Sequence, residues 1–279
     1  MKKEKKVKPI EINTEVIPVE ISNEVLQIHS KEKKWFVAVY TAAVKNYCDN
    51  LFFTALNAAV EHDGGCEVHV IDNTSDLSYM DSLSELVHNK DFLYHLDIPI
   101  EPKETLFHRR ITESVNHLRE LFLTTEYEYF VIIESDLLIP IDFFSKMRHA
   151  IITLETHSNK WAMIGGHYYD GFHDFKRLGV YESHHILSGC TVYNRSVIEK
   201  IPFRFSIENL AAFPDAWICY DVNKSNIEEK MYGYGDIICE HLTSDIVGRG
   251  RNQILKTIKK NTDKAIPKTI PKNINYRRR

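Results

Sequence analysis

Two carboxylates stand one residue apart in the segment YFVIIESDLLIP, which covers residues 129–140. Glu134 and Asp136 follow five apolar residues, and apolar residues resume directly after them. Carboxylate oxygens in such a pair can hold a divalent cation together with the phosphates that the cation binds. An acidic pair at a strand end can also be a solvated turn or cap, so the surrounding elements have to decide between the two.

The pattern before the pair predicts alternating strands and helices. Residues 35–41, WFVAVYT, are a continuous apolar run, which is typical of a strand buried on both faces. Residues 47–62 place apolar side chains at helical spacing, and Gly64-Gly65 ends that helix. A second strand follows and ends at Asp72. Strand, helix and strand with short connections predict a βαβ unit with a parallel strand pair.

The alternation continues along the chain and predicts an α/β fold, a mostly parallel sheet flanked by helices. The further strands are expected over 91–98, 129–136, 161–169 and 236–242, and the further helices over 77–89, 109–126, 140–155, 195–200 and 214–232. Ligands of such sheets bind beyond the carboxyl ends of the strands. Thr41, Asp72 and the Glu134/Asp136 pair all stand at such ends, which favours a binding site over a simple turn.

Four short segments follow one another in an order that is informative as a set. They are VIDNTSD (70–76), ESD (134–136), LSGCTVYNRSVIEKIPF (187–203) and FPDAWICYDV (213–222). Their order and their placement at strand ends resemble the GT-A fold glycosyltransferases of the family 2 type, over residues 35–245. The resemblance implies a Rossmann-like GT-A domain whose donor substrate is a nucleotide-diphospho-sugar.

The resemblance assigns the nucleotide to the first strand ends and to a later loop. Asp72 would accept hydrogen bonds from the base or ribose, and Thr41 and Ala42 would line the same pocket. The segment IVGRGRN contains Arg249 and Arg251. These two guanidinium groups could reach the diphosphate from a mobile lid, because their geometry suits phosphate oxygens.

The resemblance also assigns a metal site to the acidic segment. Asp136 would bind the Mn²⁺ or Mg²⁺ ion that bridges the diphosphate, with Ser135 lining the donor site beside it. Glu134 stands where the D-x-D motif of the family has its first Asp, so it would contact the ribose or the metal, in part through water. His241 follows the last predicted strand and would be a further metal ligand, since a neutral imidazole can bind beside carboxylates.

A general base is expected at the start of the helix near 214–232. Inverting members of the family use an Asp there to take the proton of the acceptor hydroxyl. By position this residue is Asp215, with Asp221 as the second candidate. The family has Glu before this Asp, whereas this chain has Pro214. Pro-Asp is also a good helix start without any catalytic role.

The bulk properties are those of an ordinary globular protein of 279 residues, with 43% apolar and 27% charged residues. We find no apolar run near the roughly 18–20 residues of a membrane helix, and the basic start lacks the apolar stretch of a secretory signal. The five cysteines are odd in number and show no CxxC spacing. They predict reduced thiols and a cytoplasmic protein.

The net charge of −4 conceals a basic C-terminal tail. Residues 249–279 carry eleven Lys or Arg and one acid, residues 1–8 carry a charge of +4, and the body between carries −18. We therefore expect three parts: an N-terminal arm over 1–34, a GT-A domain over 35–248 and a basic tail over 249–279. The tail could be solvated, or it could meet an anionic partner such as nucleic acid or a membrane surface.

The combined prediction is a metal-dependent hexosyl- or pentosyltransferase that moves a sugar to an acceptor hydroxyl, with inversion favoured. The acceptor could be a glycan, a lipid, a protein or, if the basic tail binds DNA, a hydroxylated base flipped out of the duplex, as in phage DNA glycosyltransferases. An inactive nucleotide-sugar-binding domain is the alternative that Glu134 and Pro214 would fit. Nucleotidyl transfer is disfavoured, because the segment VYTAAVKNY after the first strand has no glycine.

Overall fold

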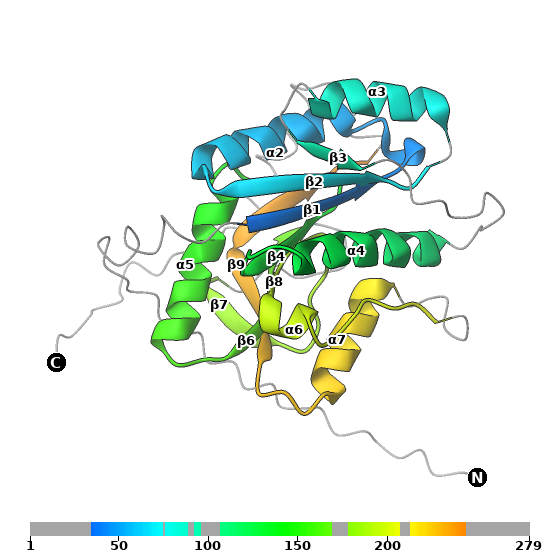
Figure 1. Ribbon diagram of the computed structural model, residues 1–279. Coiled ribbons are helices and arrows are strands. Elements are labelled where there is room, and N and C mark those ends of the chain that lie inside the picture. Colours follow the sequence, from blue (N-terminus) through cyan, green and yellow to red (C-terminus); the bar gives the residue numbers. More distant parts are fainter. Residues whose placement is uncertain are drawn as a thin grey trace, which may run out of the picture.

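The computed structural model describes residues 35–74, 76–88, 92–95, 107–168, 178–206 and 213–243. These residues form a nine-stranded sheet with helices packed against it (Figure 1). The expected N-terminal arm and basic tail lie outside the described residues, and so do Arg249 and Arg251.

The first half of the chain builds parallel strands joined by crossover helices, as the sequence predicts. Its elements are β1 (Trp35–Thr41), the 3₁₀ turn η1 (Ala43–Lys45), α2 (Asp49–Asp63), β2 (Cys66–Asp72), α3 (Leu77–His88), β3 (Leu93–His95), α4 (Phe107–Leu123) and β4 (Tyr129–Ile133). Strand β1 lies between β2 and β4 and is parallel to both, and β3 is parallel to β2. Gly64 caps α2 with a left-handed φ of 71°, which glycine adopts without steric cost.

The second half adds strands of both directions to the same sheet. Its elements are β5 (Leu137–Leu138), α5 (Phe143–Thr156), β6 (Trp161–Tyr168), β7 (Val180–Ser183), β8 (Cys190–Asn194), α6 (Arg195–Ile198), α7 (Pro214–Lys224) and β9 (Lys230–His241). The strand order is β3-β2-β1-β4-β8-β6-β9-β5, with β7 also paired to β9. Strands β8, β5 and β7 run opposite to the other six described strands. The sheet is therefore mostly parallel, as predicted.

The core consists of two apolar layers, one on each face of the sheet. Alternate residues of β1 point to opposite faces, as the pleat of a strand requires. Trp35, Val37 and Val39 pack in the layer that contains α2, α3 and α5. Phe36 and Ala38 pack in the layer that contains α4, α6 and α7. The unbroken apolar run of β1 is thus explained by burial on both faces.

Several predicted boundaries are wrong, and three of them concern elements around the acidic turn, α7 and β9. The helix expected over 214–232 ends at Lys224, and Ser225 is already extended. The short strand expected over 236–242 is the 12-residue β9. This strand pairs with β6 on one side and with β7 and β5 on the other, so long-range pairing overrides the local pattern. The strand expected over 129–136 ends at Ile133, because Glu134, Ser135 and Asp136 form a turn into β5.

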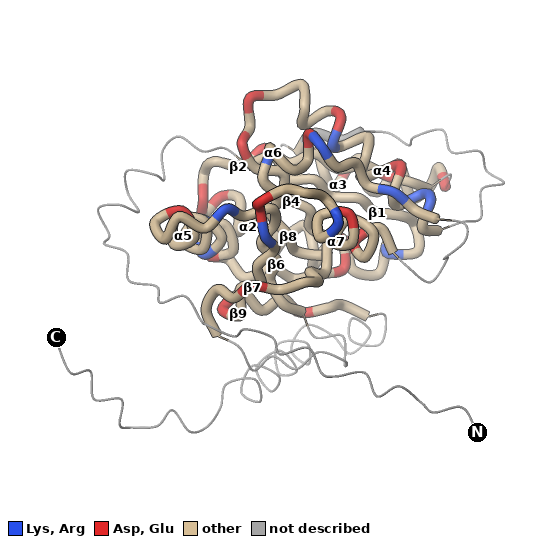
Figure 2. The backbone as a smooth tube through the Cα atoms, turned by 90° about the horizontal axis from the view of Figure 1, so that it is seen from below, with Lys and Arg blue, Asp and Glu red and all other residues tan. Residues whose placement is uncertain are grey.

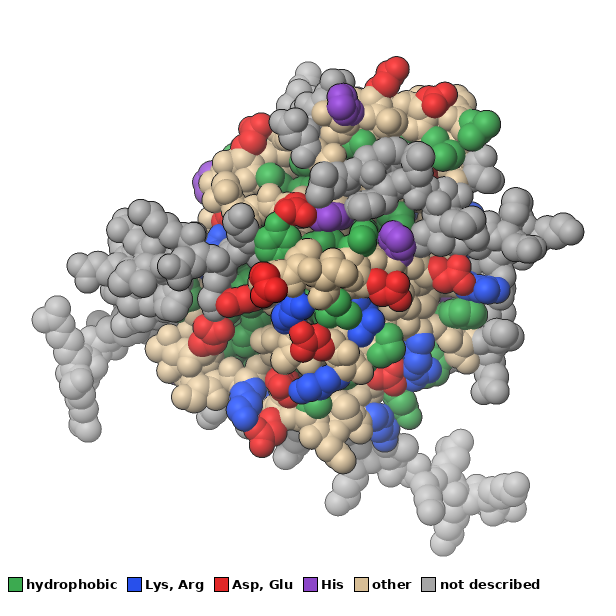
Figure 3. Space-filling model, in the orientation of Figure 1, with side chains coloured by type: hydrophobic (Ala, Val, Ile, Leu, Met, Phe, Trp, Pro, Cys, Tyr) green, Lys and Arg blue, Asp and Glu red, His purple; other side chains and the backbone are tan. Residues whose placement is uncertain are grey.

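The positions of acidic and basic residues are spread along the backbone of the described elements (Figure 2). On the face shown in Figure 3, acidic and basic side chains lie interspersed rather than in separate fields. A tight contact with an anionic polymer needs a basic patch or stripe. The described residues on this face carry charges of both signs instead. None of the helices described is long and apolar enough to cross a membrane.

A buried ion pair joins two helices of one layer, α2 and α5. Asp63 is the last residue of α2, and its two carboxylate oxygens accept from Arg148 Nη2 of α5 at 2.7 and 2.8 Å. Trp35 Nε1 donates to the same carboxylate at 3.2 Å. The Arg148 and Asp63 side chains are only 7% and 4% exposed. The pair therefore fixes how α2 and α5 pack over β1.

Asp63→Ala is expected to lower the free energy of unfolding by about 3 kcal/mol, because it leaves a buried guanidinium without its carboxylate. Urea unfolding followed by circular dichroism measures the change. The matched control is Glu228→Ala, which removes the exposed Lys160–Glu228 pair and is expected to leave the unfolding midpoint unchanged. Equal midpoints for Asp63→Ala and the wild type would contradict the prediction.

Candidate functional site

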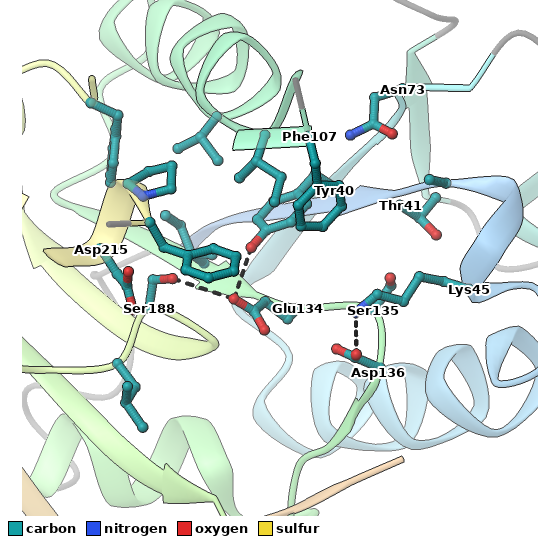
Figure 4. Close-up of a pocket in the computed structure, with 18 of the residues that line it drawn as sticks. Tyr40, Thr41, Lys45, Asn73, Phe107, Glu134, Ser135, Asp136, Ser188 and Asp215 are labelled. Atoms are coloured by element: carbon teal, nitrogen blue, oxygen red, sulfur yellow. Dashed lines mark hydrogen bonds and ion pairs between the residues drawn. The ribbon is translucent and has the colours of Figure 1, made fainter. Parts of the chain in front are cut away.

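A cavity of about 410 Å³ opens at the carboxyl ends of β1, β2 and β4 (Figure 4). Its walls also include α4, the start of α7 and the end of β9. It is the place where an α/β sheet is expected to bind a ligand. The residues predicted as site residues that line it are Thr41, Ala42, Glu134, Ser135, Asp136, Asp215 and His241.

Asp136 is the centre of the polar end of the cavity. It is 3% exposed, and its Oδ2 atom accepts from Lys45 Nζ in an ion pair and lies 3.1 Å from His241 Nε2. Its Oδ1 atom is buried and has no hydrogen-bond partner among the described residues. A buried carboxylate oxygen is costly to leave unpaired. The Oδ1 atom is therefore the oxygen of this carboxylate that can still take a further partner.

The pKa values of the two predicted metal ligands, Asp136 and His241, shift in opposite directions. Burial acts to raise the pKa of Asp136, but the His241 hydrogen bond and the Lys45 charge outweigh burial and hold this pKa below its ordinary value. The hydrogen bond to Asp136 raises the pKa of His241 against the effect of burial. Asp136 is thus an ionised carboxylate over the whole neutral range.

Strand pairing, not sequence proximity, brings His241 to Asp136. Leu137 of β5 is the register partner of His241 in β9, and Leu242 N donates to Asp136 O at 2.7 Å. The turn that holds Asp136 is closed by Leu137 N, which donates to Glu134 O at 3.1 Å. Two residues 105 positions apart therefore become neighbours through a two-residue strand.

Glu134 faces a different set of partners from Asp136. Its Oε1 atom accepts from Tyr40 at 2.8 Å and from Ser188 at 3.3 Å. Burial, and next the charge of Asp136, raises the pKa of Glu134 against the effects of Lys45 and the Tyr40 hydrogen bond. A Cβ atom at Gly189 would lie 3.2 Å from the Glu134 carboxyl carbon. Glu134 is thus held by Tyr40 and Ser188, whereas Asp136 contacts Lys45 and His241 (Figure 4).

Asp215 lies at the other end of the cavity from Asp136 and Lys45 (Figure 4). It stands in the first turn of α7, directly after Pro214, where proline is well tolerated because its missing N–H is not needed. Its Oδ1 atom accepts from Ala216 N at 2.7 Å. Its charge also contributes to the raised pKa of Glu134, after burial and Asp136. Asp215 and the acidic turn therefore line the same cavity.

Asp221 and Asp72 lie outside the cavity lining. Asp221 binds Arg204 with both oxygens, at 2.6 and 2.8 Å. Asp72 is fully buried, and its Oδ1 atom accepts from Thr74 N at 2.9 Å, which is an Asx turn. The next residue, Asn73, lines the cavity in this region.

The structure adds lining residues that the sequence reasoning missed. They include Tyr40, Lys45, Asn73, Tyr168, Ser188 and the apolar group Phe107, Ile111, Val115, Phe203 and Phe213. Lys45 carried a usable signal, as the single basic residue in VYTAAVKNY. The apolar group carried none, because apolar residues on α4 and before α7 are expected in the core.

Neither a protein-family model nor a curated protein matches the chain. Solved structures do match. The mannosyltransferase PcManGT from Pyrobaculum calidifontis, in complex with GDP-Man and Mn²⁺, has a TM-score of 0.54 and 14% identity, over 76% of this chain and 58% of that one. S. aureus TarS 1-349, in complex with UDP-GlcNAc, has a TM-score of 0.51 and 13% identity, over 79% of this chain and 60% of that one.

A third structure is similar over more of its own length. Glucosyl-3-phosphoglycerate synthase from Mycobacterium tuberculosis, in complex with Mn²⁺, UDP and phosphoglyceric acid, has a TM-score of 0.50 and 11% identity, over 86% of this chain and 79% of that one. The chain has the GT-A fold. The described cavity lies at the carboxyl edge of the sheet of this fold. At this identity the likeness establishes the fold alone, and the chain spans only 37% of the longer TarS chain.

Proposed function

We propose that the chain is a metal-dependent glycosyltransferase that moves a sugar from a nucleotide-diphospho-sugar to an acceptor hydroxyl with inversion. One observation carries the proposal: an Asp136–His241 pair and Asp215 face opposite ends of one cavity at the carboxyl edge of a GT-A sheet. The Asp136–His241 pair suits the diphosphate end of the donor. The Asp215 carboxylate suits the acceptor end.

The residues at the polar end fit a divalent cation. His241 Nε2 lies 3.1 Å from Asp136 Oδ2, so these two side chains would hold the ion together, and imidazole and carboxylate groups are both common ligands of divalent ions. No cluster of three His, Cys, Asp or Glu side chains around a metal position occurs among the residues described. The remaining ligands would be diphosphate oxygens and water, as is usual for ions that bind nucleotides. When bound, the ion would neutralise the charge that develops on the leaving diphosphate.

Asp215 is the proposed general base. An ionised carboxylate at the acceptor end can take the hydroxyl proton while that oxygen attacks the anomeric carbon. Attack from the side opposite the diphosphate inverts the configuration at that carbon. Thr41, Ala42 and Asn73 line the part of the cavity proposed for the nucleoside. Asp72 would support that part by shaping the turn that contains Asn73.

Glu134 has a proposed positioning role between the two ends. Its partners Tyr40 and Ser188 come from β1 and from the segment before β8, so the carboxyl group connects two walls of the cavity. The replacement of Asp by Glu at this position, and of Glu by Pro214, leaves Asp136 and Asp215 in the cavity. An active transferase is therefore favoured over an inactive binding domain. The acceptor hydroxyl would belong to a glycan, a lipid, a protein or a base in DNA.

Thermal-shift measurements test the proposal with a panel of UDP- and GDP-sugars, each with and without Mn²⁺. At least one sugar nucleotide is expected to raise the Tm more with Mn²⁺ than the sum of the separate shifts. A ligand at about 100 times its Kd stabilises the folded state by about 2.7 kcal/mol. Slow release of free sugar from the same nucleotide would then show the transferase chemistry with water as acceptor. A panel without any stabilising member would contradict the proposal.

A further inference from the structure

Lys45 lines the cavity, but the predicted site gives this residue no role. Among the described residues that line the cavity, it is the only Lys or Arg. Its ammonium group forms an ion pair with Asp136 Oδ2, the oxygen that also lies 3.1 Å from His241 Nε2. A lysine cation therefore sits on the carboxylate that is proposed to bind the metal ion.

The backbone around Lys45 is held close to the acidic turn. Lys45 N donates to Ala42 O at 2.8 Å, and Cys48 N donates to Lys45 O at 3.0 Å. The Cys48 thiol lies within hydrogen-bond distance of Lys45 O at 2.9 Å and of Ser135 O at 3.2 Å. One buried side chain thus connects the turn after β1 to the turn that carries Asp136. The contact between Lys45 and Asp136 follows from this packing.

The lysine side chain can leave Asp136 without moving its backbone. It is 26% exposed, and it carries a compact charge on a flexible four-carbon stem. A divalent ion on Asp136 would repel this ammonium group at a distance of a few ångströms. The ammonium group could then turn within the same cavity toward phosphate oxygens, for which a lysine is a good point-charge partner.

We propose that Lys45 and the divalent ion exchange at Asp136. In the free protein Lys45 neutralises the carboxylate, and on donor binding the ion takes its place while the ammonium group moves to the diphosphate. This inference rests on the proposed function, because it assumes a nucleotide diphosphate in the cavity. It makes metal binding depend on the nucleotide: the ion alone must displace Lys45, whereas the ion with a diphosphate gives Lys45 a new anionic partner.

The test is Mn²⁺ affinity without nucleotide, measured from the free-ion signal in electron paramagnetic resonance. Lys45→Met and Lys45→Gln are expected to bind Mn²⁺ about tenfold tighter than the wild type, because no ammonium group competes for Asp136. With saturating Mn²⁺, the same two variants are expected to bind UDP or GDP about tenfold more weakly, because the phosphate partner is lost. Lys45→Arg keeps the charge and is expected to bind Mn²⁺ as weakly as the wild type.

Lys146→Met is the matched control, since Lys146 pairs with Asp142 on the surface of α5. It is expected to match the wild type in both titrations. Unchanged or weaker Mn²⁺ affinity in both neutral Lys45 variants would overturn the exchange, even if the wild type binds a nucleotide with Mn²⁺ as proposed. A wild type that binds neither UDP nor GDP with Mn²⁺ would instead count against the proposed function.

Discussion

Asp215→Asn is expected to lower kcat for sugar transfer about 10³-fold, which is within the usual contribution of a general base. The substitution keeps the size of the side chain and the oxygen that accepts from Ala216 N. It removes only the capacity to take a proton. The affinities for the nucleotide sugar and for Mn²⁺ are therefore expected to stay near the wild-type values, and steady-state kinetics with calorimetric titration would separate the two effects.

Asp221→Asn is the control for this prediction, because Asp221 was the other candidate base on the same helix. Its carboxylate binds Arg204 outside the cavity lining, so its loss is expected to change stability rather than kcat. If Asp221→Asn abolishes transfer and Asp215→Asn does not, the assignment of the base is wrong. If both variants transfer sugar at the wild-type rate, the carboxylate mechanism itself fails.

Asp136→Asn is expected to abolish the Mn²⁺-dependent part of nucleotide binding and to lower kcat/KM about 10³-fold. The reason is that an amide oxygen is a far weaker ligand than a buried carboxylate, and several kcal/mol of charge stabilisation on the leaving diphosphate is lost with the ion. The measurement is the difference between UDP or GDP affinity with and without Mn²⁺. In the variant, that difference is expected to vanish.

Two further observations make this result specific. The Asp136 hydrogen bond raises the pKa of His241, so NMR titration of the metal-free variant is expected to show this pKa lower than in the wild type. That shift would report the lost contact without any enzyme assay.

Asp142→Asn removes an exposed acid at the start of α5 and is expected to bind nucleotides as the wild type does. Full Mn²⁺ dependence in Asp136→Asn would place the metal site elsewhere.

The elements that could be predicted are those whose own residues show a burial pattern. The unbroken apolar run of β1, the helical spacing before Gly64 and the repeated strand–helix order each report burial of a single element. These patterns were enough to predict a parallel sheet and to expect ligands at its carboxyl edge. The helix predicted over 214–232 was too long, because residues 230–232 belong to β9. This strand forms because β6 and β7 pair with it, and such long-range pairing leaves no periodic signal in the segment itself.

Short-range patterns were enough to predict that Thr41, Glu134 and Asp136 lie at strand ends and that Asp215 begins a helix. Which of the predicted side chains share a cavity depends on the packing of distant elements. The pairing of β5 with β9 brings His241 to Asp136. Asp221 instead binds Arg204 outside the cavity lining. The Asp136 contact of Lys45 joins residues 91 positions apart. Such contacts depend on how whole elements pack, which no window of the sequence records.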